Sequence, residues 1–121
     1  MIDHIQTRLK DILRSQAPAL KVEVESDKNF VVSGTIPVMQ GKQKVEGHYF
    51  ASVTPKPKDI RLYFFPIYTH PDEFADISEE FRKCLKGKSC FHIKKWSDEL
   101  DAEVQAAVKK GVELYQKDGL I

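Results

Sequence analysis

The chain has 121 residues, of which 41% are hydrophobic and 31% are charged. These proportions are typical of a soluble globular domain and exclude collagen-like, low-complexity and largely disordered chains. The formal net charge is +1, from 19 basic and 18 acidic side chains, so no overall electrostatic field would attract nucleic acid or an anionic membrane. A chain of this length can bury one core, and we expect a single domain over residues 1–121.

The cysteines and the amino terminus bear on the cellular compartment. Cys84 and Cys90 are too few for a disulfide framework and lack the short spacing of a zinc knuckle, so we expect free thiols in a reducing compartment. Charged residues interrupt the apolar ones throughout the first 13 residues, which is typical of neither a signal peptide nor a membrane span. We therefore expect a cytoplasmic protein with no membrane partner.

The first half of the chain predicts one helix followed by four strands. Apolar residues at three- and four-residue steps predict an amphipathic helix that ends near Pro18. Strict alternation predicts a strand over residues 21–25. Branched and aromatic residues predict three more, over residues 30–36, 44–53 and 59–65. The links between these strands are short, so neighbouring strands should pair antiparallel.

A second helix and a last strand are predicted after residue 65. Thr69 can cap a helix and Pro71 suits its first turn, and an apolar stripe continues from there to Leu85. Gly87 is placed to end that helix with a left-handed residue. Alternation then predicts a short strand over residues 90–94.

The closing helix has the clearest periodicity in the chain. Ser97 is a natural cap, and the apolar stripe from Leu100 to Tyr115 keeps a helical period over four turns. Val108 lies at the centre of the stripe and should be buried, whereas Lys109 lies on the opposite face. Gly111 lies within the stripe at a cost in helix propensity, which suggests that another backbone approaches it closely.

The predicted elements define the fold class. Their order is α-β-β-β-β-α-β-α, and neither an internal repeat nor a linker divides the chain. We therefore expect an α+β domain in which the N-terminal helix and the long C-terminal helix pack on one face of an antiparallel sheet of about five strands.

Several stretches of the chain resemble the YdhG-like family of small domains of unknown function. They are IRLYFFP (60–66), LKGKSCFHIKK (85–95), FASV (50–53) and FVVSG (30–34). The resemblance covers nearly the whole chain and implies a single YdhG-like domain over residues 1–121. Some relatives in this family have been described as frataxin-like iron chaperones, so the resemblance also implies iron as a possible cargo.

Acidic residues are the candidate iron ligands, because iron ions favour hard oxygen donors. Five carboxylates near predicted helix starts qualify, namely Asp72, Glu73, Asp76, Asp98 and Asp101. Acidic residues at helix starts also stabilise the helix dipole without any metal. A frataxin-type site would place its acids chiefly on the first helix, which carries only Asp3 and Asp11. We expect no other cofactor.

Alternation along the predicted strands divides their side chains between two faces. Ile60, Leu62 and Phe64 should face the helices, and Tyr49 and Ala51 are taken to point the same way. The predicted ligand-binding residues on the second face are then His48, Phe50, Arg61, Tyr63, Phe65 and His92. An aromatic and basic face of this kind marks a ligand groove or a partner surface, unless the segment over residues 66–87 folds across it.

Catalytic and nucleic-acid motifs are not evident. The sequence holds no phosphate loop, serine elbow or recognisable pair of catalytic carboxylates. Cys90 lies beside several lysines that would lower the pKa of its thiol, but a strand cysteine is more often an inert packing residue. The lysines between Lys83 and Lys95 suit a solvated turn and edge strand, so we do not expect a nucleic-acid partner.

The sequence therefore predicts a non-enzymatic ligand-binding or interaction module. Its partner would be an unknown small molecule or protein that contacts the aromatic face of the sheet. The alternative function is that of a frataxin-like intracellular iron-binding chaperone that uses the acidic residues.

Overall fold

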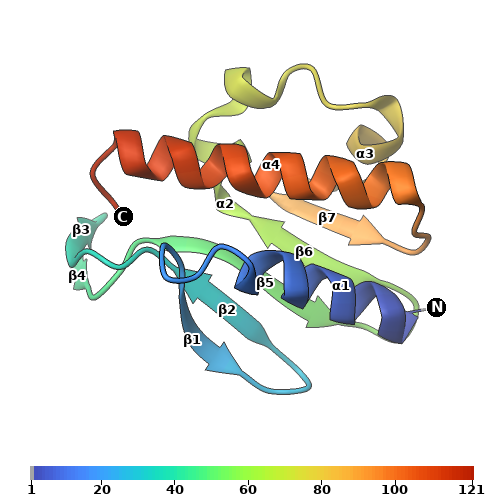
Figure 1. The fold of residues 1–121 in the computed structure, drawn as a ribbon, viewed down its shortest axis with the longest axis horizontal. Coiled ribbons are helices and arrows are strands. Elements are labelled where there is room, and N and C mark those ends of the chain that lie inside the picture. The colour runs from blue at the N-terminus through green and yellow to red at the C-terminus, as the bar shows by residue number, and fades with distance from the viewer. Residues whose placement is uncertain (1) are drawn as a thin grey trace.

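The computed structural model describes residues 2–121 and has an α+β architecture (Figure 1). The strands are β1 (Lys21–Glu25), β2 (Phe30–Ser33), β3 (Val38–Gln40), β4 (Gln43–Val45), β5 (Tyr49–Pro55), β6 (Ile60–Phe64) and β7 (Cys90–Ile93). The helices are α1 (Ile2–Arg14), α2 (Phe65–Thr69), the 3-10 helix η1 (Pro71–Phe74), α3 (Glu79–Cys84) and α4 (Asp98–Lys117). Five strands form an antiparallel sheet in the order β1-β2-β5-β6-β7, and β3 and β4 form a separate hairpin.

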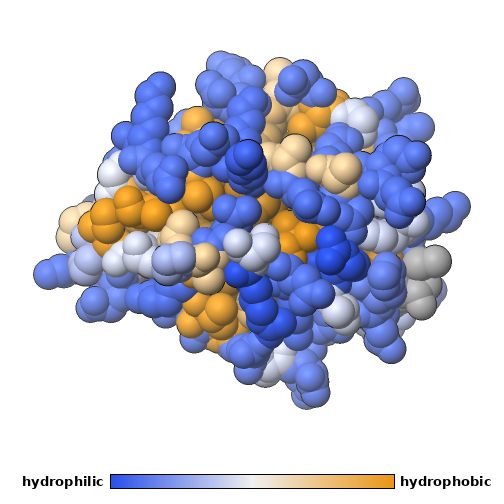
Figure 2. All heavy atoms as spheres, viewed as in Figure 1, coloured by the Kyte–Doolittle hydropathy of each residue, from blue (hydrophilic) through white to orange (hydrophobic). Residues whose placement is uncertain are grey.

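Both long helices cover the same face of the sheet, as expected (Figure 1). Ile5, Leu9 and Leu13 of α1 are fully buried there, together with the apolar stripe of α4. Hydrophilic side chains cover most of the molecular surface on this side, and apolar atoms show only in patches between them (Figure 2). Each helix therefore presents its apolar side to the sheet and its polar side to water. No helix in the described part of the chain is long and apolar enough to cross a membrane.

The closing helix forms as its sequence predicts. The Ser97 hydroxyl accepts a hydrogen bond of 3.1 Å from the backbone N–H of Leu100, and Val108 is 1% exposed whereas Lys109 is exposed. A β-carbon at Gly111 would lie 3.0 Å from both Phe50 Cζ and Pro66 Cγ. Close approach at this glycine is thus confirmed, but aromatic and proline side chains make it rather than a backbone.

The single helix predicted over residues 69–85 is wrong, because three short helices occupy the segment from α2 to α3. The two phenylalanines of its stripe have separate partners: Phe74 packs edge-to-face on Phe64, and Phe81 stacks on Phe91 with ring centroids 4.3 Å apart. α3 has its own cap, since Ser78 Oγ accepts from the N–H of Phe81. α3 ends at Cys84, three residues before Gly87, so Gly87 does not end the helix as predicted. With φ of +88°, it lies in the turn that leads into β7.

Three other predicted boundaries also change. The first helix ends at Arg14, ahead of Pro18, and the strand predicted over 30–36 ends at Ser33. The strand predicted over 44–53 is divided between β4 and β5. The division falls at Gly47, where a β-carbon would clash with the Gly34 carbonyl oxygen. The backbones cross there too closely for a side chain, so the chain turns out of the hairpin before it joins the sheet.

An irregularity at the start of β5 overturns the predicted orientation of Phe50. Ala51 pairs with Val32, but Tyr49 pairs with the next residue, Ser33, so the register between β2 and β5 shifts at this point. Phe50 is 0% exposed and packs edge-to-face on Phe64 and Tyr115 in the core. A bulge breaks strict alternation, which is why Phe50 and Ala51 are both buried. Tyr49, predicted to face the helices, instead contacts Ser52 on the other side.

Candidate functional site

The side of the sheet away from α1 and α4 carries three of the six predicted ligand-binding residues, Arg61, Tyr63 and His92. We call this side the outer face. Across its middle, Ser52 of β5 pairs with Tyr63 of β6, and Tyr63 pairs with Cys90 of β7. The outer-face cluster consists of Tyr49, Ser52, Asp59, Arg61, Tyr63, Cys90 and His92. The two long helices lie on the opposite side of the sheet, and within this cluster Ser52 and Asp59 are buried while the other side chains are partly exposed.

Asp59 organises one end of the outer-face cluster. Its carboxylate is 8% exposed and accepts a hydrogen bond of 3.3 Å from Arg61 Nε. His92 Nδ1 lies 3.9 Å from the other carboxylate oxygen. Arg61 and His92 are neighbours across β6 and β7, so one buried carboxylate holds Arg61 by a hydrogen bond and lies close to His92.

Burial disfavours ionisation of Cys90 and Tyr49 on this face. Burial raises the pKa of the Cys90 thiol above its ordinary value, and the nearby Tyr63 hydroxyl only partly opposes the rise. Burial also raises the pKa of Tyr49, whose hydroxyl lies 2.7 Å from Ser52 Oγ. The thiol is therefore protonated at neutral pH, where a nucleophilic cysteine would be ionised.

His48 and Phe65 lie together at one end of β5, apart from Arg61, Tyr63 and His92. Their ring centroids are 5.5 Å apart, and His48 Nδ1 lies 3.1 Å from the hydroxyl of Tyr115. Tyr49 connects this pair to the outer face, because its ring centroid is 5.6 Å from that of Phe65. Sequence reasoning missed Tyr49, and no local signal in the sequence marks the bulge that turns it outward.

Hollows lie at both ends of the outer face. One, of about 410 Å³, is bounded by the β3–β4 hairpin and lined by Val31, Ser33 and Tyr49 among others. The second, of about 380 Å³, lies at the edge of β7 and includes Asp59 and His92. Between them the face is formed by the pleated strands themselves, with Tyr63 near its middle.

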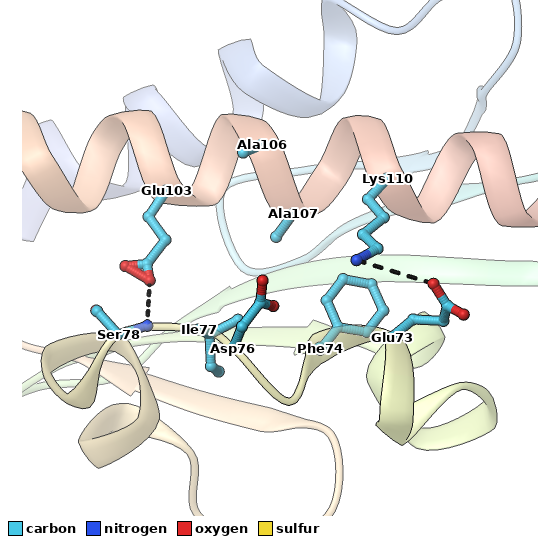
Figure 3. Close-up of a pocket in the computed structure, with 9 residues that line it drawn as sticks. All are labelled: Glu73, Phe74, Asp76, Ile77, Ser78, Glu103, Ala106, Ala107 and Lys110. Atoms are coloured by element: carbon cyan, nitrogen blue, oxygen red, sulfur yellow. Dashed lines mark hydrogen bonds and ion pairs between the residues drawn. The ribbon is translucent and has the colours of Figure 1, made fainter.

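A third hollow lies between the η1–α3 segment and α4, and it contains two of the predicted iron ligands (Figure 3). Its volume is about 420 Å³. Glu73 Oε1 lies 3.8 Å from Lys110 Nζ, and Glu103 accepts a hydrogen bond of 2.7 Å from the backbone N–H of Ser78. Asp76 points into the hollow from the loop (Figure 3). Two of its three carboxylates therefore hold the segment against α4.

The five predicted iron ligands lie in three parts of the fold. Asp72 and Glu73 belong to η1, Asp76 to the loop that follows, and Asp98 and Asp101 to the first turn of α4. Within residues 2–121, no group of three or more histidine, cysteine or carboxylate side chains is arranged to hold a metal ion.

Asp101 makes structural contacts. Arg8 Nε and Nη2 donate to its two oxygens at 2.7 and 3.0 Å, and Trp96 Nε1 donates at 3.0 Å. The hydrogen bond from Arg8 is the main reason that the pKa of Asp101 falls to about 2. This carboxylate thus ties α1 to α4 and to the segment before α4.

Comparisons with protein-family models, with curated proteins and with solved structures gave no match to this chain. The resemblance to the YdhG-like family therefore stays a prediction.

Proposed function

We propose that the protein is a non-enzymatic interaction module that binds a protein partner through the outer face of its sheet. One observation carries the proposal. The two long helices pack on the same face, and the opposite face is left with partly buried tyrosines and a fixed arginine.

The residue types on this face favour a protein partner. Tyrosine and arginine are enriched at protein–protein interfaces and contribute much of their binding energy. Tyr49 and Tyr63 present aromatic area, and Arg61 is already held by Asp59. A side chain that is ordered before binding loses less conformational entropy when the complex forms.

The shape of the face supports the same proposal. A hollow at each end of a flat, pleated surface suits an extended partner whose side chains enter the hollows while its body crosses Tyr63. The protonated Cys90 thiol adds a small apolar contact rather than a reactive group.

Affinity capture from an extract of the source cells, quantified by mass spectrometry, tests this function. The bait proteins are the wild-type chain, an Arg61→Ser/Tyr63→Ser variant and a Tyr68→Ser control, in which an exposed tyrosine of α2 is removed instead. We expect at least one protein that wild type and control retain equally and that the double variant loses. Identical sets of captured proteins for all three baits would contradict the proposal.

The frataxin-like iron function stays a prediction from the resemblance, since no specific observation favours it. Its five carboxylates are divided among η1, the following loop and α4. We therefore propose no second function.

A further inference from the structure

The hollow at the edge of β7 joins residues from distant parts of the chain, and we call it the β7-edge pocket. Its volume is about 380 Å³. It is lined by side chains from α3, from β7 and the segments on either side of it, from α4, and from the residue that precedes β6. They are Asp59, Glu80, Lys83, Cys84, Lys86, His92, Lys94, Lys95 and Leu100.

Positive charge is concentrated in this pocket. Four of its lining residues are lysines and two are acids, although the whole chain carries a formal charge of only +1. Asp59 is engaged with Arg61, and Lys83 lies 3.5 Å from Glu79 on α3. Within residues 2–121, Lys86, Lys94 and Lys95 form no ion pair. Three ammonium groups therefore line one hollow without an ion-pair partner among the described residues, and Glu80 is the one acid of the lining that is likewise in no ion pair.

Part of the pocket wall is apolar. Leu100 is 2% exposed and belongs to the hydrophobic core, and Cys84 is partly buried against that core. Burial raises the pKa of the Cys84 thiol, so this side chain is neutral at physiological pH. A ligand that enters the pocket thus meets an apolar surface as well as the lysines.

The backbone around the pocket is well held. The Lys86 N–H donates to the Cys90 carbonyl at 2.7 Å, and Leu85 forms a bridge with Phe91. On the other side, α4 begins directly after the segment that carries Lys94 and Lys95. The backbone of the segment that carries Lys86 is therefore held by hydrogen bonding to β7, and the segment that carries Lys94 and Lys95 is anchored between β7 and α4.

We propose that the β7-edge pocket binds a small organic anion, a phosphate monoester or a carboxylate with an apolar body. The apolar body would lie against Leu100 and Cys84, and the anionic group would accept hydrogen bonds from Lys86, Lys94 and Lys95. The pocket is one of the two hollows at the ends of the outer face, and the inference goes beyond the proposed interaction function because it gives this hollow a small-molecule ligand that needs no contact with Tyr63.

Isothermal titration calorimetry with phenyl phosphate, benzoate and inorganic phosphate tests the proposal. The variant is Lys94→Gln/Lys95→Gln, and the matched control is Lys42→Gln/Lys44→Gln, which removes two exposed lysines from the β3–β4 hairpin. A Tyr63→Ser chain is titrated as well, so that the pocket and the interaction surface are tested separately. Circular dichroism establishes that each variant is folded.

We expect saturable binding of phenyl phosphate or of benzoate, and whichever binds identifies the anionic group that the pocket prefers. The phenyl group should improve affinity over inorganic phosphate about tenfold through apolar burial. Loss of two charged donors should weaken binding about 100-fold, while the control and Tyr63→Ser chains should stay within about twofold of wild type.

Three results would overturn the site. One is no saturable heat with either organic anion up to about 10 mM. Another is an equal loss of affinity in the lysine variant and its control. The third is an equal affinity for inorganic phosphate and phenyl phosphate, which would exclude the apolar contact. The two functions would be shown to be separate if the Arg61→Ser/Tyr63→Ser variant no longer captures protein partners but still binds phenyl phosphate.

Discussion

The two faces of the five-stranded sheet share every strand and differ in what their side chains do. Along β6, Ile60, Leu62 and Phe64 face the helices and are at most 1% exposed. Arg61 and Tyr63 alternate with them and are only partly buried on the outer face. One face contacts the chain's own helices through apolar packing, and the other holds partly exposed polar side chains with the separate hydrogen-bonded pairs Tyr49–Ser52 and Arg61–Asp59. Substitutions one residue apart should therefore affect different properties of the protein.

The strongest test of the covered face is Val108→Asp on α4. Val108 is 1% exposed, so the substitution would bury an unpaired carboxylate and should destabilise the fold by at least about 4 kcal/mol or unfold it. Lys109→Asp, on the exposed side of the same helix, should change stability by about 0.5 kcal/mol or less. Urea denaturation measures both, and comparable midpoints would show that the helix is wrongly phased.

Leu62→Ala should destabilise the protein by about 3 kcal/mol, because it leaves a cavity between the sheet and the helices. Partner binding by the folded fraction should be unchanged, since Leu62 does not reach the outer face. The measurement is urea denaturation, followed by affinity capture at a temperature where the variant is folded. A stability loss below about 1 kcal/mol would mean that the core can collapse around the gap.

Asp101→Asn tests the tie between the two helices. The folded pKa of about 2 lies below the ordinary value of 3.8, so the ionised carboxylate stabilises the fold by about 2 kcal/mol above pH 4. This contribution should be lost as the pH falls from about 4 through 2, because Asp101 is protonated in both states only below its folded pKa of about 2.

The free energies of unfolding of wild type and Asp101→Asn should therefore differ by about 2 kcal/mol at pH 7 and converge near pH 2. Asp98→Asn, in the same helical turn but without the contacts to Arg8, is the control. A difference that stays constant across this pH range would show that the carboxylate charge is not responsible.

Only a small effect on stability is expected from a substitution on the outer face. Tyr63→Ser should cost about 1 kcal/mol or less in urea denaturation, because the side chain is only partly covered. Capture of the partner should nevertheless be reduced. A loss as large as that of Leu62→Ala would mean that the outer face contributes to the core.

Patterns among neighbouring residues predicted the parts of the fold that depend on helical periodicity, helix capping and strand alternation. The helical period from Leu100 to Tyr115 and the cap at Ser97 are confirmed in α4. Alternation along residues 59–65 is confirmed in β6, where it separates Leu62 from Tyr63. Such signals are contained within a few neighbouring residues, so a single sequence carries them.

Features that depend on distant partners could not be predicted in the same way. Phe50 is buried because β5 shifts register against β2, which alternation within β5 does not reveal. The helix expected over residues 69–85 is divided because Phe74 and Phe81 pack on different strands. These outcomes are set by tertiary contacts that override local propensity.

The candidate site shows the same division. Alternation placed Arg61, Tyr63 and His92 on one face, where the register puts them. The lysines between Lys83 and Lys95 are visible as a run in the sequence, but the apolar wall that Leu100 adds to them is not. That wall exists because α4 returns to the edge of β7.

The two edges of the sheet limit how copies of this chain could associate. Beyond β7, Leu85 and Lys86 bond to the strand and block further pairing, whereas β1 at the other edge is exposed along its whole length. Within the five-stranded sheet, pairing between copies is therefore most open at β1 of both chains. Such a contact uses up the open edge of each copy, so it stops at two chains and cannot propagate into a filament.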